Sequence, residues 1–203
     1  MKEIAIINYG AGNLASLINA IEFLKFKPII LDKPSNKKFS HIFLPGVGNF
    51  GKLSENLRQL GFDDYLKEMS KSRSLIFGIC VGMQLLFEKS EESPAQKGLG
   101  IIPGEIKKFS FKKNNLPLPH IGFTKVNHPN SIIWNDIPDE SFFYFIHSFK
   151  LKEIKNSMSG KSNYGEDFIS YIEKENIFGC QFHPEKSHKV GLKLLDNFMN
   201  YYV

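Results

Sequence analysis

This 203-residue sequence has few cysteines, few arginines and no long hydrophobic run. Its two cysteines are too few for a disulfide framework or for a cysteine-rich zinc site. No apolar run approaches the ~18 residues of a membrane span, and the run after Met1 is too short for a signal peptide. We therefore expect a cytoplasmic protein without a membrane partner.

Arginine is scarce although the chain is basic. The net charge is +5, but among the 26 lysines and arginines only Arg58 and Arg73 are arginines. Arginine is the residue suited to bidentate contacts with bases and phosphates. The lysine pairs at 37–38, 107–108 and 112–113 are typical of a solvated surface. We expect no nucleic-acid partner.

The length predicts a single domain over residues 1–203. A chain of this size buries roughly 70% of its unfolded surface, so it requires no disulfide or metal. In the first half, short apolar runs alternate with helical patterns, which is typical of a parallel sheet covered by helices. Strands are predicted over 3–8, 28–31, 41–44 and 74–79. Helices are predicted over 13–25 (behind an Asn13 cap), 53–60, 65–69 and 83–88.

The second half has a different pattern. A polar loop is predicted over 89–104, and a closing amphipathic helix over 187–200. Strands are predicted over 106–111, 141–146, 168–173 and 177–182, the last two as a hairpin around 174–176. The predicted fold class is α/β, a mostly parallel open sheet with helices on both faces and antiparallel strands added late in the chain.

A glycine-rich turn follows the first predicted strand. Residues Gly10–Ala15 match G-x-G-x-x-A, and Asp32 lies about 20 residues beyond Gly12, as a dinucleotide-binding fingerprint requires. The alternative is a tight strand-to-helix turn that uses glycine for its backbone freedom. A dehydrogenase also needs a substrate-binding part for which the chain leaves little room. A dinucleotide-binding module is the weaker hypothesis.

A cysteine stands between a strand and a helix in the motif Gly78-Ile79-Cys80-Val81-Gly82. This is the nucleophile-elbow arrangement with sulfur in place of oxygen, and the glycines relieve crowding at the sharp turn. A helix N-terminus favours the thiolate, and the Val81 amide is left free to stabilise an oxyanion. The alternative is a buried, unreactive cysteine. Strand, paired glycines and helix together favour a nucleophile.

A base and an orienting acid follow near the other end of the chain. In an extended segment held by Pro184, His183 and Glu185 point the same way, so Glu185 can orient the imidazole. A second oxyanion donor is expected from Pro45-Gly46-Val47-Gly48, a loop whose glycines allow a main-chain amide to flip. Cys180, in the apolar run before the His183 segment, is assigned no role.

Four segments of the sequence resemble the class I glutamine amidotransferases, most of all the glutaminase subunits of imidazole glycerol phosphate synthases. They are Asn8–Asn13, Pro45–Gly48, Gly78–Gln84 and Gln181–Ser187. The segment Tyr144–Ser148 narrows the resemblance to this subfamily. The family uses the Gly10 turn near a subunit interface, not for a dinucleotide.

The resemblance implies a role for each matching residue. The catalytic residues are Cys80 as nucleophile, His183 as general acid and base, and Glu185 as its orienter. The oxyanion hole comes from Val47, Gly48 and Val81. L-glutamine is held by Gly46, Gln84, Glu92, His147, Ser148 and Phe149, although Glu88 and Glu91 compete with Glu92 for that role. The partner-facing residues are Asn13, Tyr144 and Lys186; no metal or cofactor is implied.

The resemblance further implies hydrolysis of glutamine through a cysteine thioester. Ammonia then passes to a separate (β/α)₈ synthase subunit in a heterodimer, which makes imidazole glycerol phosphate and AICAR in histidine biosynthesis. Gly122-Phe123 and Phe149 depart from the tryptophan and tyrosine usual in the family. These departures leave open a paralogue that feeds a synthase for amidinated surface sugars. A thiol hydrolase that acts alone on another amide or ester is a third hypothesis.

Overall fold

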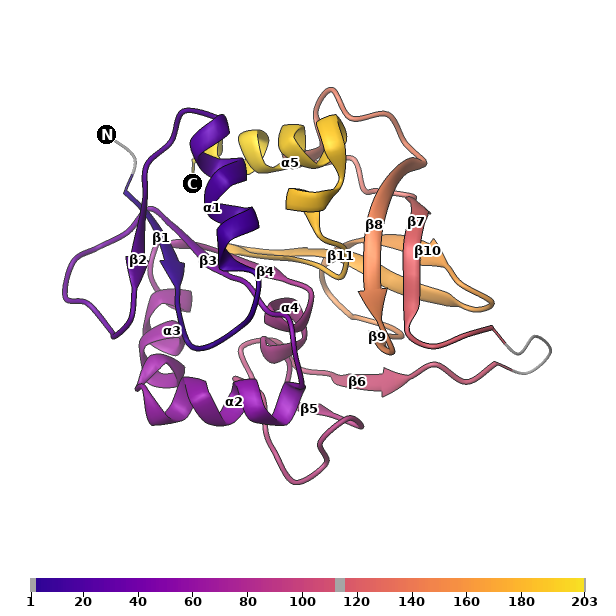
Figure 1. Ribbon diagram of the computed structural model, residues 1–203, viewed down its shortest axis with the longest axis horizontal. Helices are drawn as coiled ribbons and strands as arrows, with labels where there is room; N and C mark the ends of the chain where they lie inside the picture. The colour runs from indigo at the N-terminus through magenta and orange to yellow at the C-terminus, as the bar shows by residue number, and fades with distance from the viewer. Residues whose placement is uncertain (1–2, 112–115, 203) are drawn as a thin grey trace.

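A ten-stranded mixed sheet divides two layers of helices (Figure 1). The structure, a computed structural model, describes residues 3–111 and 116–202, so the lysine pair at 112–113 lies outside the described residues. No helix in these two ranges is long and apolar enough to cross a membrane.

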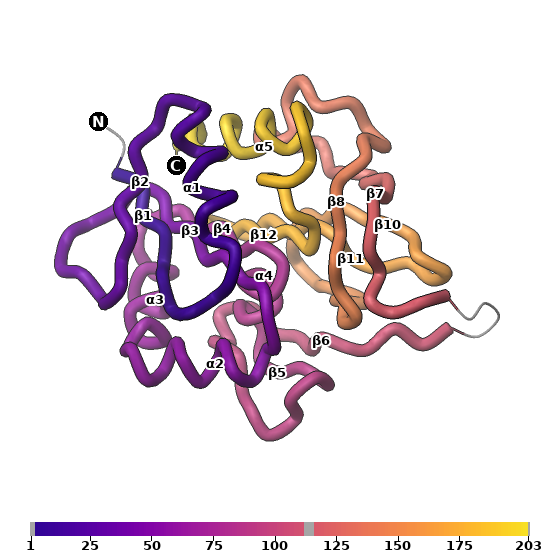
Figure 2. The backbone as a smooth tube through the Cα atoms, in the orientation of Figure 1, coloured from indigo at the N-terminus to yellow at the C-terminus, as the bar shows by residue number. Residues whose placement is uncertain are grey.

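The parallel half of the sheet is built from short apolar runs, as predicted. Its strands, in spatial order, are β2 (Pro28–Leu31), β1 (Ile4–Ile7), β3 (His41–Leu44), β4 (Leu75–Ile79) and β12 (Ile177–Cys180). Both faces of β1, β3, β4 and β12 are buried, which accounts for continuous rather than alternating apolar sequence. Figure 2 shows β12, from the end of the chain, lying beside β4.

Antiparallel strands continue the sheet beyond β12. They are β11 (Asp167–Lys174), β9 (Phe149–Leu151) and β6 (Glu105–Lys108), with β10 (Met158–Asn163) paired to β11, and the two-residue β5 (Lys89–Ser90) lies at this edge parallel to β6. The predicted hairpin is confirmed, since Lys174 pairs with Ile177 and Glu175 turns the chain with a φ of 55°. The predicted strand over 106–111 was too long, and β5, β9 and β10 were missed.

Two further strands form a separate antiparallel pair, β7 (His120–Val126) and β8 (Ser141–His147). The prediction missed β7 because buried and exposed positions alternate along it in the opposite sense to the polarity of their side chains. His120 is buried, whereas Ile121 and Phe123 are exposed. A search for apolar residues on the core face therefore finds no strand here.

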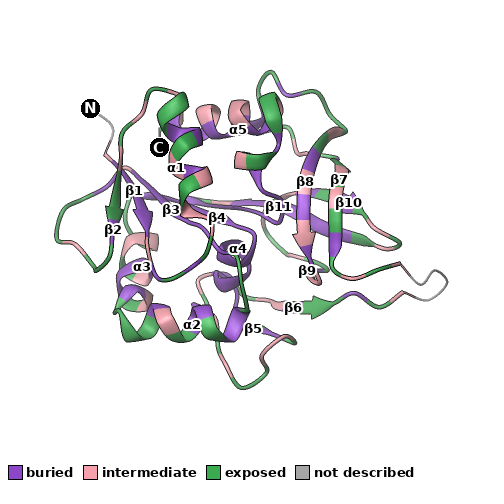
Figure 3. Cartoon of the chain, in the orientation of Figure 1, coloured by how far each residue is buried: buried purple, intermediate pink, exposed green. Residues whose placement is uncertain are grey.

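Helices cover both faces of the sheet, as predicted. In Figure 1, α1 (Leu14–Phe23) and α5 (His188–Asn200) lie on one side, and α2 (Phe50–Gln59) and α3 (Phe62–Ser70) on the other. The short α4 (Val81–Leu85) follows β4 directly, and two 3₁₀ turns are η1 (Ile132–Trp134) and η2 (Pro184–Lys186). Figure 3 shows that the buried faces of the longer helices turn toward the sheet.

Capping explains where the helices differ from prediction. The Asn49 side chain accepts a hydrogen bond from the Lys52 amide at 3.0 Å, so α2 starts at Phe50 rather than at 53. Gly61, with a φ of 77°, separates α2 from α3. Asn13 is not a side-chain cap of α1, because it has a φ of 68° and makes no capping bond.

The C-terminal ends of the parallel strands meet at one edge of the sheet. The turn after β1, the loop after β3, Cys80 after β4 and the His183 segment after β12 all emerge there. Ligands of open α/β sheets bind at this edge. The topology thus brings together four segments that are widely separated in the sequence.

The crossing of the β3–α2 loop over the start of α4 leaves no room for a side chain at Gly82. A Cβ there would lie 1.8 Å from the Leu44 carbonyl oxygen. We predict that Gly82→Ala lowers the free energy of unfolding by at least about 1–3 kcal/mol in denaturant titrations, because backbone must move.

Gly12→Ala is the matched control. Its Cβ would lie 3.7 Å from the nearest atom, the Val47 carbonyl oxygen, which is an ordinary contact. Its effect should stay within about 0.5 kcal/mol. An equal loss in both variants would refute the crowding argument.

Candidate active site

Cys80 occupies a strained turn between β4 and α4. Its backbone has a φ of 55° and a ψ of −113°, a region that residues with side chains rarely adopt. The turn is enforced on both sides, because a Cβ at Gly78 would lie 2.7 Å from the Met83 Cα and Gly82 is blocked by Leu44. The Cys80 amide donates to the Cys180 carbonyl at 2.8 Å. The predicted elbow is therefore present.

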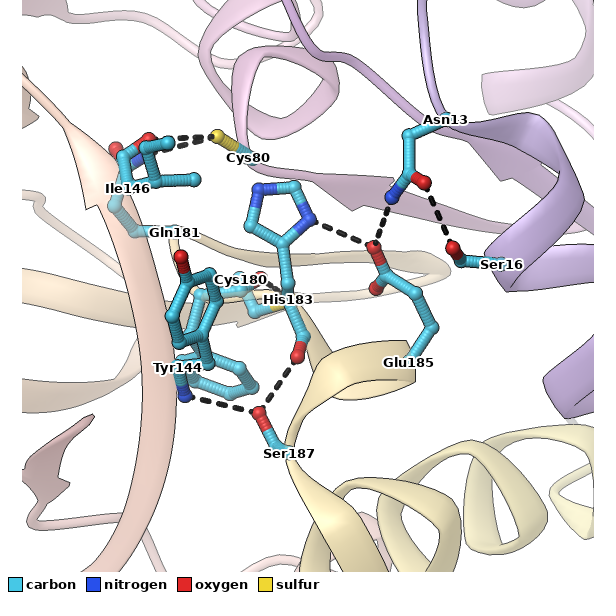
Figure 4. A network of polar contacts seen from close by, with 11 residues as sticks. Asn13, Ser16, Cys80, Tyr144, Ile146, Cys180, Gln181, His183, Glu185 and Ser187 are labelled. Carbon is cyan, nitrogen blue, oxygen red and sulfur yellow. Dashed lines mark hydrogen bonds and ion pairs between the residues drawn. The ribbon is translucent and has the colours of Figure 1, made fainter. Parts of the chain in front are cut away.

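His183 and Glu185 stand beside this turn. The His183 Nδ1 lies 2.7 Å from Glu185 Oε1, and Figure 4 shows the ring between Cys80 and Glu185. The segment is not extended as predicted, because Pro184–Lys186 forms the 3₁₀ turn η2. His183 itself is extended, and the single turn after it brings the carboxylate back to the ring.

The backbone of His183 is fixed by β8 and by Ser187. The His183 amide donates to the Tyr144 carbonyl at 2.8 Å, and Ser187 Oγ donates to the His183 carbonyl at 2.6 Å. Ser187 Oγ also accepts from the Tyr144 amide at 3.0 Å. These bonds set the position of the imidazole relative to the sulfur.

Charge around His183 favours its protonated form. Burial disfavours the imidazolium and lowers the pKa, but the neighbouring Cys80 sulfur and the Glu185 carboxylate outweigh burial and raise the pKa to about 10. Glu185 Oε1 is the partner of Nδ1, while Nε2 is buried and makes no hydrogen bond with any described residue. Nε2 is thus the ring atom available for proton exchange at the cavity.

A cavity of about 280 Å³ opens in front of the sulfur. It is lined by Val47, Gly48, Cys80, Val81, Gln84, Glu92, Pro119, Ile146, His147, Ser148, Phe149 and His183. Ten of these twelve residues are ones the sequence predicted for the site. Glu185 lies behind His183, and Gly46 faces the adjoining hollow that it shares with Asn13 and Glu185.

The structure distinguishes among the three candidate glutamates. Only Glu92 lines the cavity, where its Oε2 accepts from the Phe50 amide at the start of α2 at 2.8 Å. Glu88 accepts from the Gly104 amide and Glu91 from the Lys108 amide, each outside the cavity. The expectation of Glu92 is thus consistent with the geometry.

The expectation of a free Val81 amide is wrong for this conformation. The Val81 N–H donates to the Gly46 carbonyl at 3.2 Å. The absence of a side chain at Gly46 permits this approach, since a Cβ there would lie 2.3 Å from the Gly82 nitrogen. Rotation of the Gly46–Val47 peptide would free the Val81 N–H and turn the Val47 N–H over.

The glycine turn after β1 supports this loop instead of a nucleotide. The Gly12 amide donates to the Val47 carbonyl at 3.3 Å, so it is not free for a phosphate. Asp32, the expected ribose ligand, accepts from Asn8 Nδ2 at 2.6 Å. These contacts disfavour the dinucleotide hypothesis.

Asn13 and Tyr144, two of the residues expected to face a partner, also contact the catalytic segment. Asn13 Nδ2 donates to Glu185 Oε1 at 3.4 Å, and Ser16 Oγ donates to Asn13 Oδ1 at 2.7 Å. Lys186 is exposed, with its Nζ 5.9 Å from the centre of the Tyr144 ring. Their role toward a partner stays a prediction.

A chain of hydrogen bonds through two buried histidines ends at the cavity wall. His147 Nδ1 lies 2.8 Å from the Phe149 carbonyl, which can only accept, so Nδ1 carries the proton. His147 Nε2 must then accept from His120 Nδ1 at 3.0 Å, and His120 Nε2 from Thr124 Oγ1 at 2.8 Å. Burial lowers the pKa of His147 to about 3 and that of His120 to about 4, which keeps both rings neutral.

Several residues that touch the site were not predicted. Tyr9 donates to the Pro45 carbonyl at 2.5 Å, and its burial and the nearby Cys80 raise its pKa. The Ile146 carbonyl lies 3.8 Å from Cys80 Sγ, and Gln181 Nε2 lies 3.6 Å from it. Tyr9 and Gln181 stood inside the segments that carried the resemblance. Ile146 acts through its backbone, which leaves no signal in sequence.

The geometry agrees with the family comparison. The family model described as "Glutamine amidotransferase class-I" matches residues 5–201. Among curated proteins, the imidazole glycerol phosphate synthase subunit HisH of Sulfurimonas denitrificans is 40% identical over 202 residues, covering 98% of each chain. That of Methanocaldococcus jannaschii is 42% identical over 199 residues, covering 97% of this chain and 98% of its own.

Solved structures share the fold at lower identity. A crystal structure of a glutamine amidotransferase has a TM-score of 0.76 at 14% identity, covering 97% of this chain and 98% of its own. The PurLQS structure from Thermotoga maritima has a TM-score of 0.74 at 19% identity, covering 99% of each chain. At such identities the likeness establishes the fold alone.

The neutral histidine pair predicts a loss of stability in mild acid. Because the folded-state pKa values of His120 and His147 lie below the ordinary 6.5, their contribution is present above pH 6.5 and is lost as pH falls toward 3. Each adds a slope of up to about 1.4 kcal/mol per pH unit. His183, with its raised pKa, stays protonated in the folded chain over this range, so it cannot cause a loss of stability as the pH falls.

The measurement is the free energy of unfolding between pH 6.5 and 5, above the range in which most carboxylates titrate. His120→Gln should flatten the slope, whereas His188→Gln, at an exposed position, should leave it unchanged. An unchanged slope in His120→Gln would contradict neutral burial of this pair.

Proposed function

The chain belongs to the class I glutamine amidotransferase family, and on that premise we propose that it is the glutaminase subunit of an imidazole glycerol phosphate synthase. The observation that carries the proposal is the convergence of Cys80, His183 and Glu185 on one cavity at the sheet edge. The near full-length similarity to HisH subunits supports the assignment to histidine biosynthesis.

The first chemical step forms a thioester. His183 Nε2 takes the Cys80 proton, and the sulfur attacks the side-chain amide carbon of glutamine. Collapse of the tetrahedral intermediate breaks the C–N bond, and the imidazolium returns the proton to the departing ammonia. Glu185 holds Nδ1–H throughout, so that Nε2 is always the exchanging atom.

The second step regenerates the thiol. His183 takes a proton from water, whose oxygen attacks the γ-glutamyl thioester, and the C–S bond breaks with its electron pair on sulfur. The imidazolium then protonates the sulfur, and glutamate leaves. The net reaction is glutamine plus water to glutamate plus ammonia, with no cofactor consumed.

Glutamine is oriented by the part of the cavity built from α4, the loop after β5 and the β8–β9 connection. Gln84, Glu92 and the His147–Phe149 segment line that part of the cavity, and a carboxylate such as Glu92 suits the substrate's ammonium group. The Phe149 carbonyl is held by Gln84 Nε2 at 3.1 Å and by His147 Nδ1 at 2.8 Å. This segment is therefore fixed before substrate arrives.

The orientation of one peptide in the oxyanion hole controls the rate of turnover. With the Val81 amide bonded to Gly46, the site lacks one of its donors until the Gly46–Val47 peptide rotates. Loss of one such donor costs about 3 kcal/mol in comparable sites. We expect slow turnover by the isolated chain and faster turnover when a partner favours the rotated peptide.

The proposed partner is a (β/α)₈ synthase subunit that receives ammonia and makes imidazole glycerol phosphate and AICAR. Asn13, Tyr144 and Lys186 are the residues proposed to face it, and Asn13 already contacts the Glu185 carboxylate. A cytoplasmic location fits a biosynthetic heterodimer of this kind.

The test is reaction with a glutamine-like chloroketone. We predict an adduct on Cys80 and none on Cys180, which is fully buried and has a raised thiol pKa because of burial. Mass spectrometry of peptides locates the adduct. In the complex, Cys80→Ser should lower glutamate release by more than about a thousandfold, whereas Cys180→Ala should retain most of it.

An adduct confined to Cys180, or full glutamate release by Cys80→Ser, would overturn the proposed mechanism. The acceptor is tested separately, by the product that the complex forms from ammonia.

A further inference from the structure

Gln181 lies against the nucleophile and has no role in the mechanism above. It follows β12 directly, two residues before His183, and its side chain is fully buried. Its Nε2 donates to Cys80 Sγ at 3.6 Å, and its Oε1 accepts from Gln84 Nε2 at 2.9 Å. One amide therefore connects the reacting sulfur to a residue of the substrate cavity (Figure 4 shows its contact with the sulfur).

The orientation of the Gln181 amide follows from which of the neighbouring atoms can donate and which can only accept a hydrogen bond. The Phe149 carbonyl can only accept, so the Gln84 atom 3.1 Å from it must be the amino nitrogen. The same nitrogen faces Gln181, so the Gln181 atom that faces it must be the oxygen. The amino group of Gln181 is thereby left on the side of the sulfur.

The Gln181 donor matters because few of the other groups around the sulfur stabilise a thiolate. The Ile146 carbonyl, 3.8 Å from Sγ, can accept S–H but only repels a thiolate. The titratable groups near Cys80 are His183 with Glu185 behind it, Tyr9 after β1 and Cys180 at the end of β12, and His147 and Glu92 line the same cavity. Of these, only protonated His183 brings positive charge toward the sulfur.

An N–H donor gains strength when its acceptor becomes an anion. The Gln181 amino group therefore favours the thiolate over the thiol, against the Ile146 carbonyl. The same bond is available when the C–S bond of the thioester breaks and the electron pair returns to sulfur. Its oxygen meanwhile holds Gln84, whose nitrogen fixes the Phe149 carbonyl at the cavity wall.

We propose that Gln181 is a further catalytic residue, whose amide N–H stabilises the Cys80 thiolate while its carbonyl positions Gln84 toward glutamine. This inference rests on the proposed function, because it takes Cys80 as the nucleophile. It predicts that the two halves of one amide serve two separable steps, sulfur activation and substrate binding.

Two variants separate the halves. Gln181→Glu keeps an oxygen acceptor for Gln84 but replaces the donor to sulfur with a second oxygen. Gln181→Met has a similar length and removes both groups. In each, the pH midpoint of Cys80 alkylation by iodoacetamide should move upward, because the thiolate has lost a donor; the carboxylate of Gln181→Glu adds to the shift, so Gln181→Met measures the lost donor without a new charge.

Saturation kinetics with a glutamine-like chloroketone give the second readout. For Gln181→Glu, the maximal labelling rate at neutral pH should fall by about 10- to 100-fold, the range for a hydrogen bond to a charged group, while the half-saturating concentration stays unchanged. For Gln181→Met, the half-saturating concentration should also rise. Ser74→Ala, at a buried residue that bonds the Phe39 carbonyl at the end of β4 opposite Cys80, is the control and should match the wild type.

A wild-type alkylation profile in a folded Gln181→Glu protein would overturn the inference. If Gln181→Glu does not fold, as thermal unfolding will show, the profile of Gln181→Met decides in the same way. Cys80→Ser keeps the two claims apart. If it is inactive and the Gln181 variants resemble the wild type, only this inference fails; if it is fully active, the proposed function fails.

Discussion

The fit of the β3–α2 loop against the start of α4 is the constraint on which the site depends. Gly82 and Gly46 lie so close to the opposing backbone that neither position has space for a Cβ. That approach holds Cys80 in its strained conformation at the sheet edge, and it also places the Gly46 carbonyl on the Val81 amide. One packing contact thus presents the nucleophile and withholds an oxyanion donor. In the proposed enzyme, the same few backbone atoms both position the Cys80 sulfur for attack and keep the Val81 amide from the oxyanion hole.

The remaining machinery reaches the sulfur through strand order. Because β12 pairs with β4, the chain delivers Gln181 and His183 beside Cys80 although about a hundred residues separate them. Strand β8 then fixes the His183 backbone through Tyr144 and supplies the Ile146 carbonyl. The Thr124–His120–His147 chain extends the polar contacts from β7 to the cavity wall. The site is therefore assembled from both the mixed sheet and the separate strand pair.

Sequence reasoning succeeded where local chemistry determines structure. The continuous apolar runs predicted the parallel strands, and the glycines around Cys80 predicted the elbow, because each depends on nearby residues. It failed where tertiary contacts decide. The inverted burial of His120 and Ile121 concealed β7, and the engaged Val81 amide follows from a loop distant in the sequence. The 3₁₀ turn at Pro184 differs from the expected extended segment, yet the His183–Glu185 contact forms in either case. Resemblance to a family supplied the cavity residues that no local pattern would have selected.

In the proposed mechanism, the sulfur of Cys80 becomes covalently bonded to the γ-carbonyl carbon of glutamine during turnover. Acid quenching of the complex during steady-state hydrolysis, followed by mass spectrometry of its peptides, tests this most directly. We predict a γ-glutamyl group on the peptide that contains Cys80, removable by hydroxylamine, and its loss in Cys80→Ser. Active complex in which that peptide stays unmodified while the group is found on another residue would contradict it.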